Sequence, residues 1–189
     1  MQTDVSLFVT LWIAFYAFWL ISAWKTRSPV KRKQSRLSYF LYGIVWVAIW
    51  IILINWFSPD LMTDRIVPDS IGYTVAGLLI TLAGLGFAIW ARVHLGKNWS
   101  GMPAIREQHT ITRTGPYRFV RHPIYSGILL GLLGTAIGTG YFIVFCCVLL
   151  ILVLFVIKFR MEEKFLEEEF GEEYARYRRE VRALVPYVI

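Results

Sequence analysis

Two segments of the sequence carry residue types that could bind a charged ligand, and the first of them is His122-Pro123. Pro123 suits the first position of a helix because its missing N–H costs nothing there. The proline also biases His122 toward an extended conformation, which makes His122 the predicted helix cap. The start of a helix offers free N–H groups and a partial positive charge, so this position favours an anion such as a carboxylate. The other interpretation is a capped helix flanked by interfacial tyrosine and arginine anchors.

The second segment begins at Lys158 and is rich in charge. Lys158 and Glu162 stand four residues apart and therefore share one face of a helix. They form either a solvated ion pair or an acidic and a basic group that line a pocket. Apolar residues recur every three to five positions, which predicts an amphipathic helix, or a pair of helices broken at Gly171 and limited by Pro186. The apolar stripe comprises Phe159, Phe165, Leu166, Phe170, Tyr174, Tyr177 and Val181.

Other patterns in the chain do not point to a metal or nucleotide site. His94, His109 and His122 are widely spaced, without a nearby cysteine or an H-E-x-x-H pair, so no metal site is predicted. The sequence contains neither a P-loop nor a G-x-S-x-G nucleophile pattern. The patterns Gly127-x-x-x-Gly131 and Gly134-x-x-x-Gly138 predict close helix packing rather than ligand binding.

Composition predicts that membrane helices position these residues. Of the 189 residues, 57% are hydrophobic and 17% charged, whereas soluble domains have about 45–50% and about 25%. Four uncharged stretches are each long enough to cross roughly 30 Å of hydrocarbon. The last of them, 124–157, is broken at Gly138-Thr-Gly140, which predicts a hairpin of two short spans. The expected fold is one all-α membrane domain, 1–189, with five transmembrane helices at about 5–24, 37–58, 70–91, 124–138 and 140–157.

The charge distribution predicts how these spans are oriented. Nineteen of the twenty lysines and arginines fall on one side, whereas Arg65 and all four aspartates fall on the other. Because cytoplasmic loops carry the excess of Lys and Arg, the N-terminus is expected outside and the C-terminus in the cytoplasm. Topology and anionic lipid then explain the net charge of +7, and nucleic acid is not an expected partner. Any active site must be assembled from the cytoplasmic segments 92–123 and 158–189 and the inner ends of the spans.

Two blocks of residues, one on each side of the predicted hairpin, carry a family resemblance. The first reads Gly115-Pro-Tyr117…Val120-Arg-His122-Pro-x-Tyr125-x-Gly127. The second reads Glu162-Glu163-x-x-Leu166-x-x-x-Phe170-Gly171-x-x-Tyr174-x-x-Tyr177. Together, in this order, they resemble the isoprenylcysteine carboxyl methyltransferase family, over roughly half of the chain from about Gly96 to Pro186. The wider group also includes phospholipid N-methyltransferases and membrane sterol reductases.

The resemblance implies that S-adenosyl-L-methionine is the methyl donor, that S-adenosyl-L-homocysteine is the product, and that both blocks bind the donor. Glu162 matches a family glutamate that holds the donor. One helical turn earlier the family has an arginine expected to meet the acceptor carboxylate, and this sequence has Lys158 there. Arg160 is the other candidate cation, although it points about 200° around the helix. Eukaryotic members carry a glutamine where Met102 aligns. The candidate catalytic residues are Lys158, Arg160 and Glu162, and the implied donor-contacting positions are His109, Thr110, Ile111, Thr112, Tyr117, His122, Pro123, Ile124, Tyr125, Glu162 and Glu163.

The resemblance also implies a reaction, which is methyl esterification of a lipophilic, prenylcysteine-like carboxylate by in-line displacement. A C-terminal carboxylate has a pKa of about 3.3–3.7, so it is already ionised and needs no general base. The protein would then position two reactants and exclude water. The alternatives are a phospholipid N-methyltransferase, whose amine acceptor would need His122 or a glutamate as base, a sterol-type reductase that uses NADPH, and a non-enzymatic scaffold that binds anionic lipid.

Overall fold

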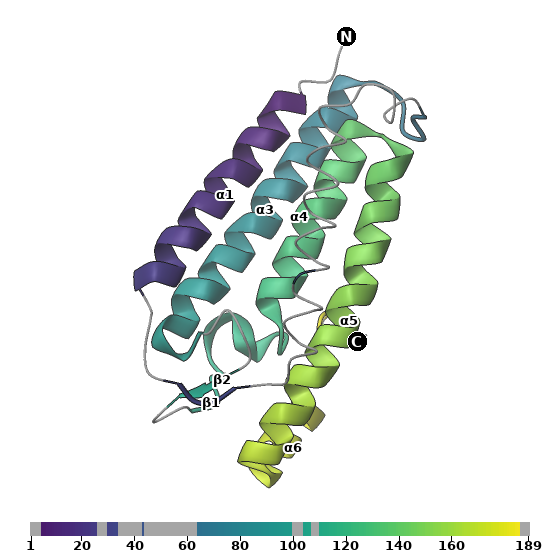
Figure 1. The fold of residues 1–189 in the computed structure, drawn as a ribbon. Coiled ribbons are helices and arrows are strands. Elements are labelled where there is room, and N and C mark those ends of the chain that lie inside the picture. The colour runs from purple at the N-terminus through teal and green to yellow at the C-terminus, as the bar shows by residue number, and fades with distance from the viewer. Residues whose placement is uncertain are drawn as a thin grey trace.

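The computed structural model describes residues 5–25, 30–33, 43, 64–99, 104–106 and 110–185. These residues form a bundle of long helices with short elements gathered at one end (Figure 1). In chain order the elements are α1 (Val5–Lys25), β1 (Val30–Lys33), α3 (Ile71–Leu95), the 3-10 turn η2 (Gly96–Asn98), β2 (Ala104–Arg106), the 3-10 turn η3 (Gly115–Arg118), α4 (Pro123–Thr139), α5 (Phe142–Phe170) and α6 (Glu172–Glu180).

Helices α1, α3 and α4 agree with the predicted spans to within a few residues. α1, α3 and α5 are each long and apolar enough to cross a membrane. α4 has 17 residues, about 26 Å at the usual rise of a helix, and pairs with α5 as the predicted hairpin. The predicted span 37–58 lies, apart from Gly43, outside the described residues, so the number of five spans stays a prediction. The chain is a multi-pass membrane protein, and large apolar side chains such as Ile13, Leu79 and Leu149 are exposed on the bundle surface.

The end of the bundle where α4 begins gathers most of the charged side chains, and we call it the charged end. α1 and α3 finish there, at Lys25 and Leu95, and α5 carries its acidic and basic residues to it (Figure 1). Strands β1 and β2 pair antiparallel at this end, a small two-stranded sheet that the sequence did not predict. Asp64 and Arg65 lie at the opposite end, where Phe142 N donates a hydrogen bond to Asp64 O.

α5 is longer than the predicted span, and this difference positions the site. The uncharged stretch ends at Ile157, but the helix continues without a break to Phe170. Lysine, arginine, glutamate and methionine are good helix formers, so the change in polarity at Lys158 does not end the helix. Gly171, with a φ of +52°, ends it as predicted and starts α6. Lys158 and Glu162 are therefore held on a rigid extension of a membrane helix.

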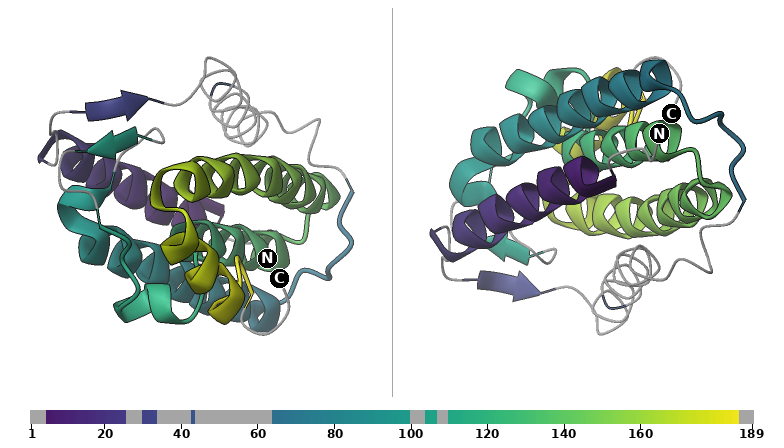
Figure 2. Two further views of the ribbon diagram at one scale, coloured as in Figure 1. Left: turned by 90° about the horizontal axis from the view of Figure 1, so that it is seen from below. Right: turned by 90° about the horizontal axis from the view of Figure 1, so that it is seen from above.

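Glycines bring α3 and α4 into direct backbone contact. A Cβ atom at Gly84 would lie 2.6 Å from the carbonyl oxygen of Gly127, and one at Gly77 would lie 2.6 Å from that of Gly134. A Cβ atom at Gly127 would likewise lie 2.6 Å from Ala88 N, and one at Gly134 would lie 2.5 Å from Thr81 N, which confirms the predicted Gly127 and Gly134 patterns as packing features. The views from the two ends of the bundle show α3 and α4 running side by side (Figure 2).

Two buried hydrogen bonds join helices inside this apolar bundle. Trp12 Nε1 donates to Thr135 Oγ1 at 3.0 Å, and Thr81 Oγ1 donates to Gly131 O at 3.1 Å. These bonds tie α1 and α3 to α4 where water is excluded, and each satisfies a polar group that would otherwise be costly to bury. The surrounding core draws on α1, α3, α4 and α5, through Trp12, Phe15, Leu85, Ala88, Leu132, Ile151, Leu154 and Phe155.

Candidate active site

His122 is the cap residue before α4, as the sequence predicted, but its ψ of 59° is not the extended conformation expected before a proline. Pro123 occupies the first helical position, and Ser126 N donates to His122 O at 3.1 Å as the first turn closes. The His122 ring is buried and stacks with two aromatic rings, with centroid distances of 5.5 Å to Tyr125 and 5.1 Å to Phe159. This stacking holds the imidazole between α4 and α5.

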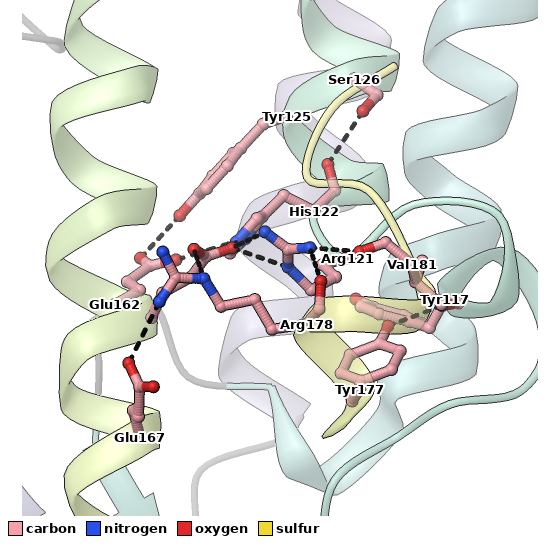
Figure 3. Close-up of polar contacts among 11 residues, drawn as sticks. Tyr117, Arg121, His122, Tyr125, Ser126, Glu162, Glu167, Tyr177, Arg178 and Val181 are labelled. Carbon is pink, nitrogen blue, oxygen red and sulfur yellow. Dashed lines mark hydrogen bonds and ion pairs between the residues drawn. The ribbon is translucent and has the colours of Figure 1, made fainter. Parts of the chain in front are cut away.

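Glu162 lies opposite the first turn of α4 and receives contacts from three side chains. Tyr125 donates its phenolic hydrogen to Glu162 Oε1 at 2.6 Å (Figure 3). Lys158 Nζ lies 3.9 Å from the same oxygen, so the predicted shared face of Lys158 and Glu162 is confirmed. His122 Nδ1 is 3.8 Å from Glu162 Oε2. Lys158 Nζ also lies 4.6 Å from the centroid of the Tyr125 ring, which is a favourable distance for a cation beside an aromatic ring.

Glu163, the next residue, is buried and points into the protein. Its Oε1 accepts from Arg121 Nε at 2.8 Å and from His122 Nε2, and it pairs with Arg121 Nη2 at 2.7 Å. Burial alone would raise the pKa of this carboxyl, but the hydrogen bond from His122 and the Arg121 guanidinium outweigh burial, so the pKa lies below its ordinary value. Glu163 is therefore an ionised carboxylate with charged hydrogen-bond partners at pH 7.

Arg121 joins Glu163 to the chain after α6. Its Nη1 donates to the carbonyl oxygens of Arg178, at 3.0 Å, and of Val181 (Figure 3). These are carbonyls at the end of α6, which a cation stabilises. The buried guanidinium thus connects α4, α5 and α6.

The segment Val181–Leu184, which we call the C-terminal strap, lies along the start of α4. Arg121 N donates to Arg182 O at 2.7 Å, and His122 N donates to Ala183 O at 2.9 Å. Ser126 Oγ donates to Leu184 O at 2.6 Å. The side chains of Ala183 and Leu184 are buried with Phe159. The strap therefore occupies part of the helix start that the sequence suggested as an anion seat.

Tyr117 supports this arrangement from η3. Its carbonyl oxygen accepts a hydrogen bond from the hydroxyl of Tyr177 at 2.6 Å (Figure 3). Burial raises the pKa of both phenols above the ordinary value, so both stay protonated. The Tyr117 ring lies beside His94, and Gly115 makes room for that imidazole with a φ of +60°. The predicted turn at Gly115–Tyr117 is confirmed.

The structure brings only part of the predicted site together. Tyr125, His122, Lys158, Glu162 and Glu163 form one cluster, with Pro123 at its base and Ile124 half-buried beside it. Thr110 and Thr112 instead receive long hydrogen bonds from Asn98, and Ile111 is half-buried between them. Arg160 is exposed, with no hydrogen bond or ion pair to the described part of the chain. His109 lies outside the described residues.

Several residues around the cluster have no role predicted from the sequence. They are Arg121, Arg178 and the C-terminal strap. Phe159 appeared only as one member of the apolar stripe, yet its position four residues before Glu163 places both on one buried helix face. That spacing was the available signal that Glu163 faces inward.

The cluster offers hydrogen-bonding and ionic groups rather than metal ligands. Glu162 and Tyr125 present oxygens suited to hydroxyl and ammonium groups, and Lys158 presents a cation suited to a carboxylate. Among the described residues, no group of three or more His, Cys, Asp or Glu side chains is placed to hold a metal ion.

Comparisons with known proteins show the family of the chain. The family model described as phospholipid methyltransferase matches residues 73–173. A probable protein-S-isoprenylcysteine O-methyltransferase of Oryza sativa is 31% identical over 119 residues, which are 62% of this chain and 57% of that protein. A methanethiol S-methyltransferase of Crocosphaera subtropica is 42% identical over 72 residues, 38% of this chain and 28% of that protein. The chain thus spans little more than half the length of the rice protein and less of the cyanobacterial one.

A solved structure has the same fold. The eukaryotic intramembrane Ras methyltransferase, an isoprenylcysteine carboxyl methyltransferase, superposes with a TM-score of 0.57 and 22% sequence identity, over 84% of this chain and 55% of that one. The matched family region covers more than half of the chain and includes every residue of the His122–Glu163 cluster. The chain therefore belongs to the phospholipid methyltransferase family of membrane methyltransferases.

Proposed function

We propose that this chain transfers a methyl group from S-adenosyl-L-methionine to the carboxylate of a lipophilic, prenylcysteine-like acceptor. The observation that carries the proposal is the Tyr125–Glu162–Lys158 cluster, in which a carboxylate, a phenol and a cation meet at the charged end of a membrane bundle. The family supports the reaction class, and this cluster supports the choice of acceptor.

The residues present suit a ligand that carries an ammonium and hydroxyl groups. Glu162 can accept hydrogen bonds from ammonium or hydroxyl groups, and Tyr125 orients that carboxylate at 2.6 Å. When bound, the donor supplies an electrophilic methyl group. The chain's own contribution is to orient this ligand and exclude water from it.

Lys158 is the better candidate for the acceptor carboxylate. Its side chain is mostly buried, on the same face of α5 as Glu162 and beside the Tyr125 ring of α4, whereas Arg160 is exposed. An ionised carboxylate held by Lys158 would sit beside a donor held by Glu162, which is the proximity that in-line displacement requires. Because the carboxylate is already a nucleophile, no proton has to be removed.

The lipophilic part of the acceptor would lie against α5. Ile157 directly precedes Lys158, and Val153 stands one turn earlier, and both are exposed on the apolar part of the helix. A lipid tail along these residues would bring its polar end to Lys158 without leaving the membrane. The strong excess of Lys and Arg around the charged end supports a cytoplasmic location for this reaction.

A protic acceptor is the second candidate. The Crocosphaera subtropica relative is a methanethiol S-methyltransferase, and a thiol, like a phospholipid amine, must lose a proton when it is methylated. His122 lies between the Glu162 and Glu163 carboxylates and is the candidate base for removing that proton. This observation favours testing a small thiol and an amine beside the carboxylate.

Methyl transfer from labelled S-adenosyl-L-methionine to three acceptors tests the proposal. The full chain in detergent is given a farnesylated cysteine analogue, phosphatidylethanolamine or methanethiol. The expected product is a base-labile methyl ester of the farnesylated acid, lost in Glu162→Gln and kept in the control Glu168→Gln, which changes an exposed residue of the same helix. Transfer to the amine or the thiol alone would overturn the carboxylate assignment. Failure of the protein to bind donor would overturn the reaction class.

A further inference from the structure

The adjacent glutamates Glu162 and Glu163 make different kinds of contact. The Glu162 side chain is 17% exposed and meets Tyr125 and Lys158. The Glu163 side chain is 4% exposed, and its Oε1 receives both Arg121 and His122. The resemblance implied donor contact for both residues, but the buried position of Glu163 indicates a different task.

The contact between Glu163 and His122 fixes the position of a proton. An ionised carboxylate can only accept hydrogen bonds, and Glu163 Oε1 lies 3.1 Å from His122 Nε2. The Arg121 guanidinium, at 2.7 Å from the same oxygen, keeps the carboxylate charged. Nε2 must therefore carry a hydrogen in both the neutral and the charged form of the ring.

The ring is also held so that its other nitrogen faces Glu162. Tyr125 and Phe159 both stack on the ring, and the backbone N–H of His122 donates to Ala183 O at 2.9 Å. Turning the ring over would break the contact with Glu163. Nδ1 therefore stays 3.8 Å from Glu162 Oε2.

We infer that Glu163 is a positioning residue that acts through His122: it locks Nε2 as the protonated nitrogen and leaves Nδ1, beside Glu162, as the atom that gains or releases a proton. A proton at Nδ1 stabilises the ionised Glu162 carboxylate. When Nδ1 has no proton, Glu162 keeps the contacts with Tyr125 and Lys158. Glu163 thereby determines which ring nitrogen faces Glu162. The charged and titratable groups around the ring are Arg121 beside it, Tyr125 from α4, Lys158, Glu162 and Glu163 from α5, and Arg178 and Tyr174 from α6.

This inference rests on the proposed function only for its consequence at Glu162, and its first test needs neither donor nor acceptor. The full chain, labelled with ¹⁵N-histidine in detergent micelles, gives signals from three histidines, and His122→Asn identifies those of His122. Across a pH titration, Nε2 of His122 is expected to stay protonated while Nδ1 changes. A titration in which Nε2 loses its hydrogen would overturn the inference.

Variants separate positioning from support of the fold. In Glu163→Gln the carboxamide can donate as well as accept, so a mixture of both neutral forms of His122 is expected, whereas Glu162→Gln should leave Nε2 protonated. A spectrum of Glu163→Gln identical to that of the wild type would contradict the assignment. If Glu163→Gln only loosened the fold, its unfolding midpoint would fall while Nε2 stayed the protonated nitrogen of neutral His122.

Binding of labelled S-adenosyl-L-homocysteine gives the functional readout. His122→Gln can place an amide donor near the Nε2 position but has no group at Nδ1, and His122→Asn has the reverse. If Nδ1 beside Glu162 matters to the ligand, His122→Gln should weaken binding at least tenfold at unchanged unfolding midpoint, and His122→Asn should weaken it less. The opposite order would overturn the role given to Nδ1. Absence of binding in the wild type would contradict the proposed function instead. The assignment of the proton to Nε2 of His122 would then be decided by the ¹⁵N-histidine spectrum alone.

Discussion

Tyr125 donates its hydroxyl hydrogen to Glu162 Oε1 across 2.6 Å, although the two residues are 37 positions apart. The α4–α5 hairpin lies between them: the chain leaves the charged end along α4, which starts at Pro123, and returns to it along α5. The bond joins the first turn of α4 to the charged extension of α5. The hairpin is thus what converts two separate sequence blocks into one cluster.

Removing this hydroxyl should weaken donor binding while leaving the fold intact. Tyr125→Phe keeps the ring that stacks on His122 and Phe155 but loses the bond to Glu162. A hydrogen bond to a charged group is worth about 1.5–3 kcal/mol, so losing the bond that orients Glu162 should lower affinity by at most roughly 10- to 150-fold. Binding of labelled S-adenosyl-L-homocysteine measures the effect, with Tyr73→Phe near the start of α3 as the control. Equal affinity in Tyr125→Phe and wild type would argue against this contact.

The two candidate cations should behave differently. Lys158→Ala removes the charge beside Glu162 and is expected to raise the KM for a farnesylated cysteine analogue at least tenfold. Arg160→Ala removes an exposed charge and should leave the KM within about twofold, since exposed charges contribute little. Steady-state methyl transfer by both variants provides the comparison. A larger effect of Arg160→Ala would reverse the assignment.

The buried pair of Arg121 and Glu163 should contribute strongly to stability. Glu163→Ala leaves a buried guanidinium without its carboxylate, which costs about 3–5 kcal/mol in comparable cases. The double variant Arg121→Met/Glu163→Leu should recover part of that loss because no charge stays buried. Unfolding midpoints in detergent give both values. If the losses in Arg121→Met and Glu163→Leu, each measured as a single variant, simply added up in the double variant, the pair would not be coupled.

Close contact of α3 and α4 predicts opposite effects at two neighbouring glycines. Gly84→Ala places a methyl group against the backbone of α4 and should destabilise by about 1–3 kcal/mol. Gly86→Ala meets no described atom within 4 Å and should be neutral or slightly stabilising, because alanine favours helix. Thermal unfolding of the pair in the same detergent tests this. Equal midpoints would mean that the helices do not approach so closely.

The sequence was sufficient for features that depend on local chemistry. The helix start at Pro123, the hairpin turn near Gly140 and the break at Gly171 each follow from the residue at that position. The shared face of Lys158 and Glu162 follows from helical spacing alone. These features set the frame of the site.

Contacts between distant segments could not be derived from local patterns. The C-terminal strap reaches the start of α4 through backbone hydrogen bonds, which leave no trace in residue type. The bond between Arg121 and Glu163 spans 42 positions, and many arginines and glutamates would fit it equally well. The length of α5 was missed because polarity changes at Lys158 while helix propensity does not.

Equilibrium binding of labelled S-adenosyl-L-homocysteine to the purified chain shows whether Glu162 holds the methyl donor. Saturable binding is expected for the wild type and for Glu168→Gln, and affinity is expected to fall at least tenfold in Glu162→Gln. Equal affinity in Glu162→Gln would move the donor away from the Tyr125–Glu162 contact. No saturable binding by the folded wild type would contradict the methyltransferase assignment itself.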